Sequence, residues 1–216
     1  MTELARDGGL IDWSLHVRGL PSRAYRDTRG PSRDQVAAIL RAADADRNPT
    51  RAARDGALLR LLYGLALRRS EVVGLDVCHL DLEGARIAIL GKGKHDRELM
   101  TLPLPVVAAL TRWLDNHPEP GPESPLFVAL DRASRGHRLS DRSVDRLVKA
   151  HCRTAEVRAC SPHALRHAAI THALDATSGD VRRVRAFSRH ARLETLTLYD
   201  DNRLDGAGAV AALVAM

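Results

Sequence analysis

A short alternating segment in the middle of the chain constrains the fold more than any other feature. Large apolar residues occupy every second position over residues 80–82 and 87–89, as Leu80, Leu82, Ile87 and Ile89, and Glu83-Gly84 separates the two runs. This pattern predicts two short strands joined by a tight turn. A glycine-bearing turn at residues 91–96 leads to a third strand-like run at 97–102. Strands joined by such short turns pair antiparallel, so we expect a small three-stranded antiparallel sheet.

Helical periodicity surrounds this sheet on both sides. Ser32 is followed three residues later by Gln35, which is typical of a capping box, and Val36 and Ile39 begin an apolar stripe. The same criteria predict helices over residues 32–43, 51–65, 105–117, 140–152, 163–177, 180–188 and 205–216, with a turn at residues 48–50. The expected fold class is therefore α+β and mainly α-helical.

The first thirty residues differ from the rest of the chain. Several arginines make residues 1–30 basic, and glycines and prolines interrupt any regular period there. We interpret this segment as a basic N-terminal arm or linker remnant. The length of the remainder, residues 31–216, suits a single domain.

Composition excludes several classes of protein. Hydrophobic residues make up 44% of the 216 residues, which is enough for a packed core and too much for a disordered tail. No apolar run reaches the roughly 18 residues of a membrane-spanning helix, and the N-terminus lacks the basic-then-apolar order of a signal peptide. We therefore expect a cytoplasmic protein without a membrane partner. The three cysteines, Cys78, Cys152 and Cys160, have no paired spacing and fit reduced thiols.

The charge suggests a polyanionic partner without requiring one. The net charge is +6, from 30 arginines and 3 lysines against 27 acidic residues. Such a balance is compatible with a nucleic-acid partner, but many basic proteins bind none. The 7 aromatic residues are too few for the stacking platforms of a single-strand binder.

Two basic segments carry side chains suited to binding a phosphate. One is Leu67–Glu71, and the other is His163–His167 at an expected helix start, where His163 and Arg166 share a face. Helix N-termini and guanidinium groups both bind anions, so these segments together predict an anion pocket. A lysine on the hairpin tip, with a histidine and a tyrosine near the C-terminus, completes a set that can attack a phosphodiester without a metal. A phenol has a pKa of about 10, so this tyrosine needs basic neighbours and a proton acceptor.

The order and spacing of these residues resemble the catalytic domain of the tyrosine recombinases, also called phage-type integrases. Members carry an arginine in a G-L-R-x-S-E-L-like box, a lysine in a G-K-G hairpin and H-x-x-R after Ser-Pro. A further histidine or tryptophan follows, and then the nucleophilic tyrosine. The matching residues here are Arg68, Lys92, His163, Arg166, His190 and Tyr199. The boxes occur in register over residues 31–216, which makes the resemblance specific.

The resemblance implies a site-specific DNA recombinase or integrase. Tyr199 is expected to attack a DNA phosphate and to form a 3′-phosphotyrosyl link with a free 5′-hydroxyl. Arg68 and Arg166 are expected to clamp the phosphate and stabilise the transition state. His163 accepts the tyrosine proton or binds the phosphate in this interpretation.

Four further residues receive roles from the same resemblance. Lys92 is the expected general acid, because lysine releases a proton more easily than arginine, and Lys94 in the same hairpin is the alternative. His190 is expected to donate a hydrogen bond to a nonbridging oxygen, and Glu71 to orient the arginine and histidine network. Contacts with DNA are expected from Lys94, Arg69, Arg182, Arg183 and Arg189.

The resemblance also implies partners and cofactors. The expected partner is double-stranded DNA, bound by a homo-tetramer, with an accessory DNA-binding protein as a possible addition. No metal or other cofactor is expected, because the phosphotyrosine conserves the energy of the broken bond. Two alternatives remain open: a type IB topoisomerase-like enzyme that nicks and reseals one duplex, and a catalytically silent DNA-binding regulator.

The chain departs from the family pattern in three places. Most members carry an N-terminal helical DNA-binding domain, whereas only residues 1–30 precede the expected catalytic domain in this sequence, so a minimal enzyme, a truncated form and a decayed gene all remain open. Ala66 stands where a glycine usually precedes Leu-Arg. Phe187, Ser188 and Arg189 precede His190 in place of the commoner Leu-Gly, so Arg189 either crowds the pocket or contacts phosphate.

Overall fold

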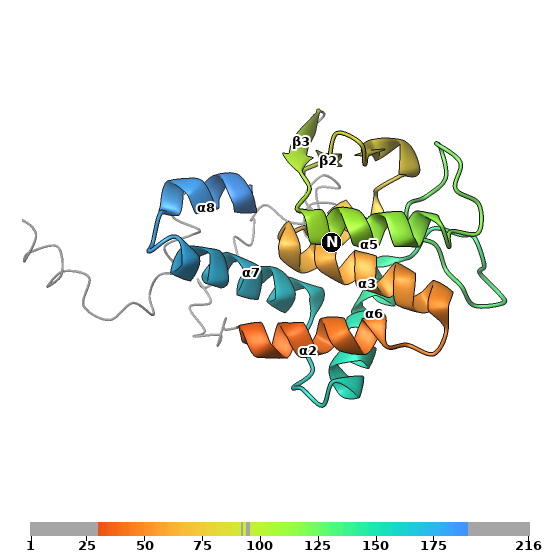
Figure 1. The fold of residues 1–216 in the computed structure, drawn as a ribbon, viewed down its shortest axis with the longest axis horizontal. Coiled ribbons are helices and arrows are strands. Elements are labelled where there is room, and N and C mark those ends of the chain that lie inside the picture. Colours follow the sequence, from red (N-terminus) through yellow and green to blue (C-terminus); the bar gives the residue numbers. More distant parts are fainter. Residues whose placement is uncertain (1–29, 92, 94–95, 190–216) are drawn as a thin grey trace, which may run out of the picture.

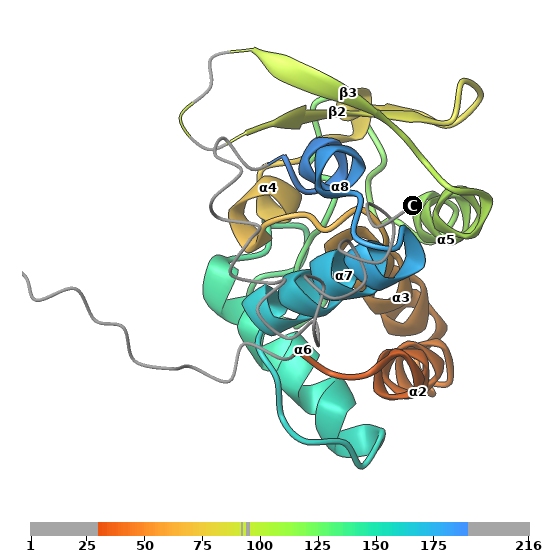
Figure 2. The same ribbon diagram turned by 90° about the vertical axis from the view of Figure 1, so that its left-hand side faces the viewer.

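The chain folds into a body of helices with a small sheet along one edge (Figures 1 and 2). The computed structural model describes residues 30–91, 93 and 96–189. Its helices are α2 (Arg33–Asp44), α3 (Pro49–Gly64), α4 (Arg69–Val73), the 3₁₀ helix η1 (Val77–His79), α5 (Leu104–Leu114), α6 (Asp141–Thr154), α7 (Pro162–Ala176) and α8 (Val181–Ser188). The predicted fold class, α+β and mainly helical, is confirmed.

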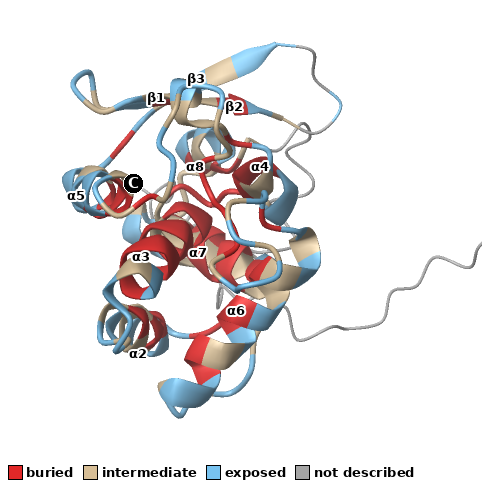
Figure 3. Cartoon of the chain, turned by 90° about the vertical axis from the view of Figure 1, so that its right-hand side faces the viewer, coloured by how far each residue is buried: buried red, intermediate tan, exposed pale blue. Residues whose placement is uncertain are grey.

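Helix α3 lies at the centre of the helical body. It is buried at almost every position from Ala52 to Leu62, and Figure 3 shows it as the most continuously buried helix. Helices α2, α5 and α7 pack around it. A helix that is enclosed on all sides needs apolar or small residues around its circumference, and the repeated Ala and Leu of α3 supply them.

Two local predictions hold at atomic detail at the start of this body. The Ser32 hydroxyl accepts a hydrogen bond from the Gln35 N–H at 3.3 Å, and the Gln35 side chain accepts one from the Ser32 N–H at 2.9 Å. This reciprocal pair is the predicted capping box of α2. Asn48 caps α3 by accepting from the Arg51 N–H at 2.9 Å, so the expected turn at 48–50 is the first turn of that helix.

The segment that carries Arg68 contains a short helix that the sequence pattern does not predict. Helix α3 ends at Gly64, and Arg68 is the N-cap of the separate helix α4. The break falls at Ala66, which has a left-handed φ of 47°. A left-handed residue ends the helical hydrogen-bond pattern, and glycine is the residue that adopts it most readily. Ala66 therefore holds, with some strain, a backbone position that suits glycine.

The predicted sheet is confirmed, with three antiparallel strands in the order β1-β2-β3. The strands are β1 (Leu80–Asp81), β2 (Arg86–Leu90) and β3 (Arg97–Thr101). Ile87 pairs with Met100 across the second ladder. Ile87 and Ile89 are fully buried against the helical body, so one face of the sheet belongs to the core.

The last three described helices begin at the residues that the sequence indicates. Ser140, Ser161 and Asp180 cap α6, α7 and α8, each accepting a hydrogen bond from the backbone N–H three residues later. Short polar side chains at these positions satisfy backbone donors that a helix leaves free at its start.

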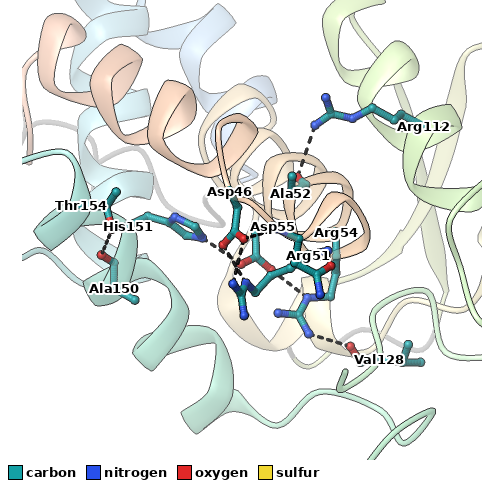
Figure 4. A network of polar contacts seen from close by, with 11 residues as sticks. Asp46, Arg51, Ala52, Arg54, Asp55, Arg112, Val128, Ala150, His151 and Thr154 are labelled. Atoms are coloured by element: carbon teal, nitrogen blue, oxygen red, sulfur yellow. Dashed lines mark hydrogen bonds and ion pairs between the residues drawn. The ribbon is translucent and has the colours of Figure 1, made fainter. Parts of the chain in front are cut away.

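A buried polar cluster joins α3 to α6 (Figure 4). Asp55 accepts from Arg54 Nε at 2.8 Å and contacts His151 Nε2 at 2.8 Å, while Arg54 Nη1 donates to the Val128 carbonyl at 3.0 Å. Asp55 and His151 are almost wholly buried. Each charged group in the cluster therefore has a partner, which is the condition for burying it at a tolerable energetic cost.

Several predictions lie outside the described residues. These concern most of the N-terminal arm, Lys92, Lys94, His190, Tyr199 and the helix expected at 205–216. Within the described part of the chain, no helix combines the length and the apolar character needed to cross a membrane.

Candidate active site

The N-terminal turns of α7 hold two predicted catalytic residues. The Ser161 hydroxyl accepts a hydrogen bond from the Ala164 N–H at 3.1 Å, and Pro162 supplies the first residue of the helix. His163 lies at the protein surface, whereas Arg166, one turn later, is 2% exposed. Figure 2 shows α7 between the end of α8 and the central helix α3.

Arg166 ties α7 to two distant segments. Its guanidinium donates to the carbonyl of Ala66, just before α4, and to the carbonyl of Ser188 at 2.5 Å, at the end of α8. These contacts place the Arg166 guanidinium, which is charged at any physiological pH, beside the segment that carries Arg68.

Arg68 reaches the same region from the start of α4. Its Nη1 donates to Glu71 Oε1 at 2.6 Å, and its backbone N–H donates to Glu71 Oε2 at 2.7 Å. Its side chain keeps 29% of its surface exposed, while that of Glu71 keeps 1%. The buried carboxylate of Glu71 therefore holds the Arg68 guanidinium on its inner side, and the solvent-exposed side of the guanidinium remains able to contact a ligand.

His163 is the third member of this group. Partial burial, followed by the positive charges of Arg166 and Arg68, holds the pKa of His163 below its ordinary value. His163 and Arg166 lie one turn apart on α7, and Arg166 reaches the carbonyl of Ala66, two residues before Arg68, so the three residues lie in one region of the molecule. His163 Nε2 also lies 2.6 Å from His167 Nε2, so one ring donates and the other accepts. An uncharged imidazole at neutral pH is suited to accepting a proton.

Glu71 is the buried anion of the site. Burial by itself raises the pKa of its carboxyl, but the charge of Arg189 and the hydrogen bonds from Arg68 outweigh burial and hold the pKa below its ordinary value. Glu71 is therefore ionised at neutral pH and bridges two arginines. This geometry fits the orienting role expected for it.

The side chain of Arg189 is buried, although the sequence leads us to expect that this residue contacts DNA at the surface. Its side chain is 3% exposed, and its Nη2 donates to Glu71 Oε2 at 2.7 Å. Its φ of 53° is left-handed, the conformation that glycine adopts readily. The expected contact with DNA phosphate does not fit this arrangement, because the guanidinium faces the protein interior. No sequence signal could have found the pairing, since Glu71 and Arg189 lie far apart in the chain.

The other residues expected to contact DNA lie on the surface. Arg69 pairs with Asp141 at 3.1 Å and remains 42% exposed at its side chain. Arg183 pairs with Asp180 at 3.2 Å and is 80% exposed, and Arg182 is also exposed. These three arginines are accessible to a large polyanion. Lys94 lies outside the described residues.

Tyr63 has the structural role that its place on an apolar helix indicates. Its hydroxyl lies 2.9 Å from His172 Nδ1, and burial raises the pKa of the phenol. A raised pKa disfavours the phenolate that a nucleophile requires. Among the described residues, no three His, Cys, Asp or Glu side chains group in a way that could hold a metal ion.

Residues 32–204 match the sequence profile of the phage integrase family, and the chain belongs to that family. It is 45% identical over 96% of its length to a tyrosine recombinase of Synechococcus elongatus, and 41% identical over 94% to one of Synechocystis. It is 38% identical over 88% of its length to tyrosine recombinase XerC of Escherichia coli. It spans 65%, 65% and 64% of the lengths of these three relatives.

Solved structures show the same fold. The XerA recombinase matches with a TM-score of 0.67 at 22% identity, covering 86% of this chain and 64% of the other. The XerH recombinase in its post-cleavage complex matches with a TM-score of 0.71 at 20% identity, covering 91% of this chain and 56% of the other. At such identities the likeness concerns the fold, so the roles of individual residues depend on the geometry above.

Proposed function

We propose that this chain is the catalytic part of a site-specific DNA recombinase that cleaves and rejoins DNA through a 3′-phosphotyrosyl intermediate. One observation carries the proposal: Arg166, which follows His163 by one turn on α7, donates to the carbonyl of Ala66, two residues before Arg68, so that segments about a hundred residues apart in the sequence meet. The names of the three sequence relatives described above, each a tyrosine recombinase, support it.

The described residues account for the binding half of the chemistry. Two guanidinium groups neutralise the nonbridging oxygens of a phosphate, and they remain charged at any pH at which DNA is stable. As a fifth oxygen bonds to phosphorus, negative charge grows on those oxygens, so fixed cations stabilise the transition state more than the ground state. Uncharged His163 takes the proton of the attacking phenol, which otherwise ionises at a pH of about 10.

The remaining roles fall on residues outside the described part. In this proposal Tyr199 attacks phosphorus and expels the 5′-oxygen, Lys92 protonates that oxygen, and His190 donates to a nonbridging oxygen. Lys94 is the alternative acid in the same hairpin. The phosphotyrosine keeps the energy of the phosphodiester, so rejoining requires no nucleotide cofactor.

Glu71 and Arg189 act as positioning residues in the proposal. Glu71 holds the Arg68 guanidinium on one side, and Arg189 holds Glu71 ionised and in place on the other. Neither Glu71 nor Arg189 is proposed to contact DNA. Removing either side chain would still displace Arg68, because the Arg68 guanidinium depends on the position of Glu71.

The proposed partner is double-stranded DNA. Structures similar to this chain include XerH bound to its difH substrate and the Tn1549 integrase in complex with transposon right-end DNA. Exposed Arg69, Arg182 and Arg183 would add contacts with the phosphate backbone, and such binding weakens as salt rises. Assembly as a tetramer on two duplexes, help from an accessory DNA-binding protein and a cytoplasmic location belong to the same proposal.

A nicked suicide duplex tests the chemistry, because the free 5′ fragment diffuses away and traps the covalent complex. We expect the unmodified chain to form an adduct that survives denaturing gel electrophoresis, and Tyr199→Phe to bind the duplex without forming it. Tyr63→Phe is the matched control, since it removes a phenol hydroxyl outside the site and should retain adduct formation.

The outcomes separate the alternatives. DNA binding without any adduct from the unmodified chain would favour a silent DNA-binding regulator. Adducts with nicking and resealing, but no strands joined between two duplexes, would favour the topoisomerase-like enzyme.

A further inference from the structure

Two cysteines near the two ends of the loop between α6 and α7 lie in contact just before the start of α7. Cys152 lies in the last turn of α6 and has no exposed surface, and Cys160 lies just before the Ser161 cap of α7 and is partly exposed. Their sulfur atoms are 3.4 Å apart, and both are free thiols. Figure 2 shows the loop that leaves α6 and turns back to the start of α7.

We propose that Cys152 and Cys160 form an oxidation-sensitive site that a hydroperoxide converts into an intramolecular disulfide. In the first step one thiolate attacks the peroxide oxygen and becomes a sulfenic acid, with release of hydroxide or alkoxide. In the second step the other thiol displaces the sulfenic oxygen as water and forms the S–S bond. The two sulfurs lose two electrons and two protons, and the peroxide is reduced to two molecules of water, or to water and an alcohol.

The geometry favours this pairing over any other. A disulfide requires a sulfur separation of about 2.05 Å, so the two atoms must approach by roughly 1.4 Å. The loop between them can supply that movement, because Glu156, Arg158 and Ala159 are exposed and not held in the core. The third cysteine, Cys78, lies exposed in η1 on another part of the molecule.

The electrostatics of the pair support its reactivity. The hydrogen bond between the two sulfurs lowers the pKa of Cys152 below its ordinary value and raises the pKa of Cys160. Such a contact favours a thiolate on one sulfur, and the thiolate is the nucleophilic form of cysteine. Cys160 is the partly exposed member of the pair, so the oxidant reaches the buried Cys152 sulfur from the side of Cys160, and whichever sulfur is oxidised first has its resolving partner 3.4 Å away.

A disulfide here would act on the proposed active site. Cys160 lies three residues before His163, and Arg166 on the same helix is bonded to two backbone carbonyls. Pulling the Cys160 loop toward α6 would displace the first turn of α7 relative to those anchors. Because catalytic groups tolerate misplacement of about 1 Å poorly, the oxidised form should cleave DNA about tenfold more slowly or worse. This consequence rests on the proposed function, whereas disulfide formation does not.

Peptide mapping tests the site directly. The protein, with Cys78→Ser to prevent intermolecular bridges, is treated with hydrogen peroxide, alkylated and digested with trypsin without reduction. Trypsin cuts after Lys149, Arg153, Arg158 and Arg166, so the two cysteines fall in separate peptides, residues 150–153 and 159–166. We expect these peptides to appear joined, lighter than their sum by two hydrogens, and to separate after dithiothreitol.

Cys160→Ser is the matched control, because it changes one atom at a partly exposed position and should abolish the joined peptide. Separate peptides after peroxide treatment, or sulfinic and sulfonic acids in place of the link, would overturn the proposal. The suicide-duplex assay on oxidised and re-reduced samples then measures the consequence. An unchanged rate of adduct formation would overturn the effect on cleavage while leaving the disulfide site. Failure of the proposed function would show differently, as no adduct even from reduced protein.

Discussion

Single residues in left-handed conformations determine how the site is assembled. Ala66 ends α3 with φ of 47°, and Arg189 ends α8 with φ of 53°. Side chains with a Cβ are disfavoured there by about 1–2 kcal/mol, so both positions suit glycine. Arg189 offsets this strain by placing its guanidinium on buried Glu71. Arg189 therefore occupies a backbone conformation that suits glycine, and its side chain makes an ion pair with Glu71 that glycine cannot make.

The variant Arg189→Gly tests whether the ion pair with Glu71 outweighs the backbone strain at position 189. Relief of backbone strain favours the variant, but Glu71 loses one of its two arginine partners inside the protein. We expect a net loss of about 1–2 kcal/mol in the free energy of unfolding at pH 7, measured by urea denaturation. Arg189→Lys, which keeps the charge but not the planar fork, should lose less.

The same variant should change how stability depends on pH. Arg189 contributes to the lowered pKa of Glu71 in the folded protein. A lowered folded-state pKa contributes stability that is fully present above the unfolded pKa, about 4.3, and is lost as pH falls through the folded pKa. The difference between the unmodified protein and Arg189→Gly should therefore be complete above about pH 5 and shrink toward pH 3. A difference that stays constant over this range would contradict the assigned ion pair.

Individual helices contribute to the site through their ends. In the proposed function, the N-terminus of α7, which carries His163 and Arg166 in its first turns, faces the DNA phosphate. Ser161 sets the start of that helix, just as Ser140 sets the start of α6. The two caps accept backbone hydrogen bonds of the same 3.1 Å length, but only one borders the candidate site.

This difference predicts that Ser161→Ala and Ser140→Ala will have similar stability but different activity. Each should lower the free energy of unfolding by about 1 kcal/mol, the usual effect of losing an N-cap hydrogen bond. Only Ser161→Ala should also slow adduct formation on the suicide duplex, because it loosens the turn that holds His163. Equal rates for the two variants would argue against a role for the α7 cap in the chemistry.

At the scale of the whole molecule, the buried polar cluster of Arg54, Asp55 and His151 holds helix α6 against the central helix α3. Asp55 on α3 and His151 on α6 are 96 residues apart in sequence and 2.8 Å apart in space. The cluster, which Figure 4 draws, borders an open groove of about 1680 Å³ that is lined by residues of α2, α3 and α6. None of Arg68, His163 and Arg166 lines that groove, so this region supports the fold away from the site.

Asp55→Asn should destabilise the protein much more than Asp46→Asn. Asp55 neutralises buried Arg54, so its loss leaves an uncompensated charge inside the protein, with a typical penalty of about 3–5 kcal/mol. Asp46 pairs with Arg51, whose side chain is 50% exposed, and an exposed pair is worth at most about 1 kcal/mol. Urea midpoints of the two variants measure the difference, and similar midpoints would contradict the importance of the buried cluster.

The sequence by itself determined most helices and the sheet of the described part of this protein, though not the short helix α4, and it indicated the candidate catalytic residues. Periodicity, caps and turn residues are local signals, so the sheet, the capped helices and the His163–Arg166 pair on one helix face were predictable. The order of the boxes led to the family for the same reason, because each motif lies within a few residues.

Only the tertiary structure decided how those residues meet. The position of Arg189 on Glu71, the anchoring of Arg166 on the Ala66 and Ser188 carbonyls, and the contact of Cys152 with Cys160 all depend on packing between helices. Such contacts follow from which faces are buried together, and no local pattern in the chain specifies them. Arg189 shows the consequence: a basic residue beside a catalytic motif suggests a phosphate contact, until burial places its charge on a carboxylate.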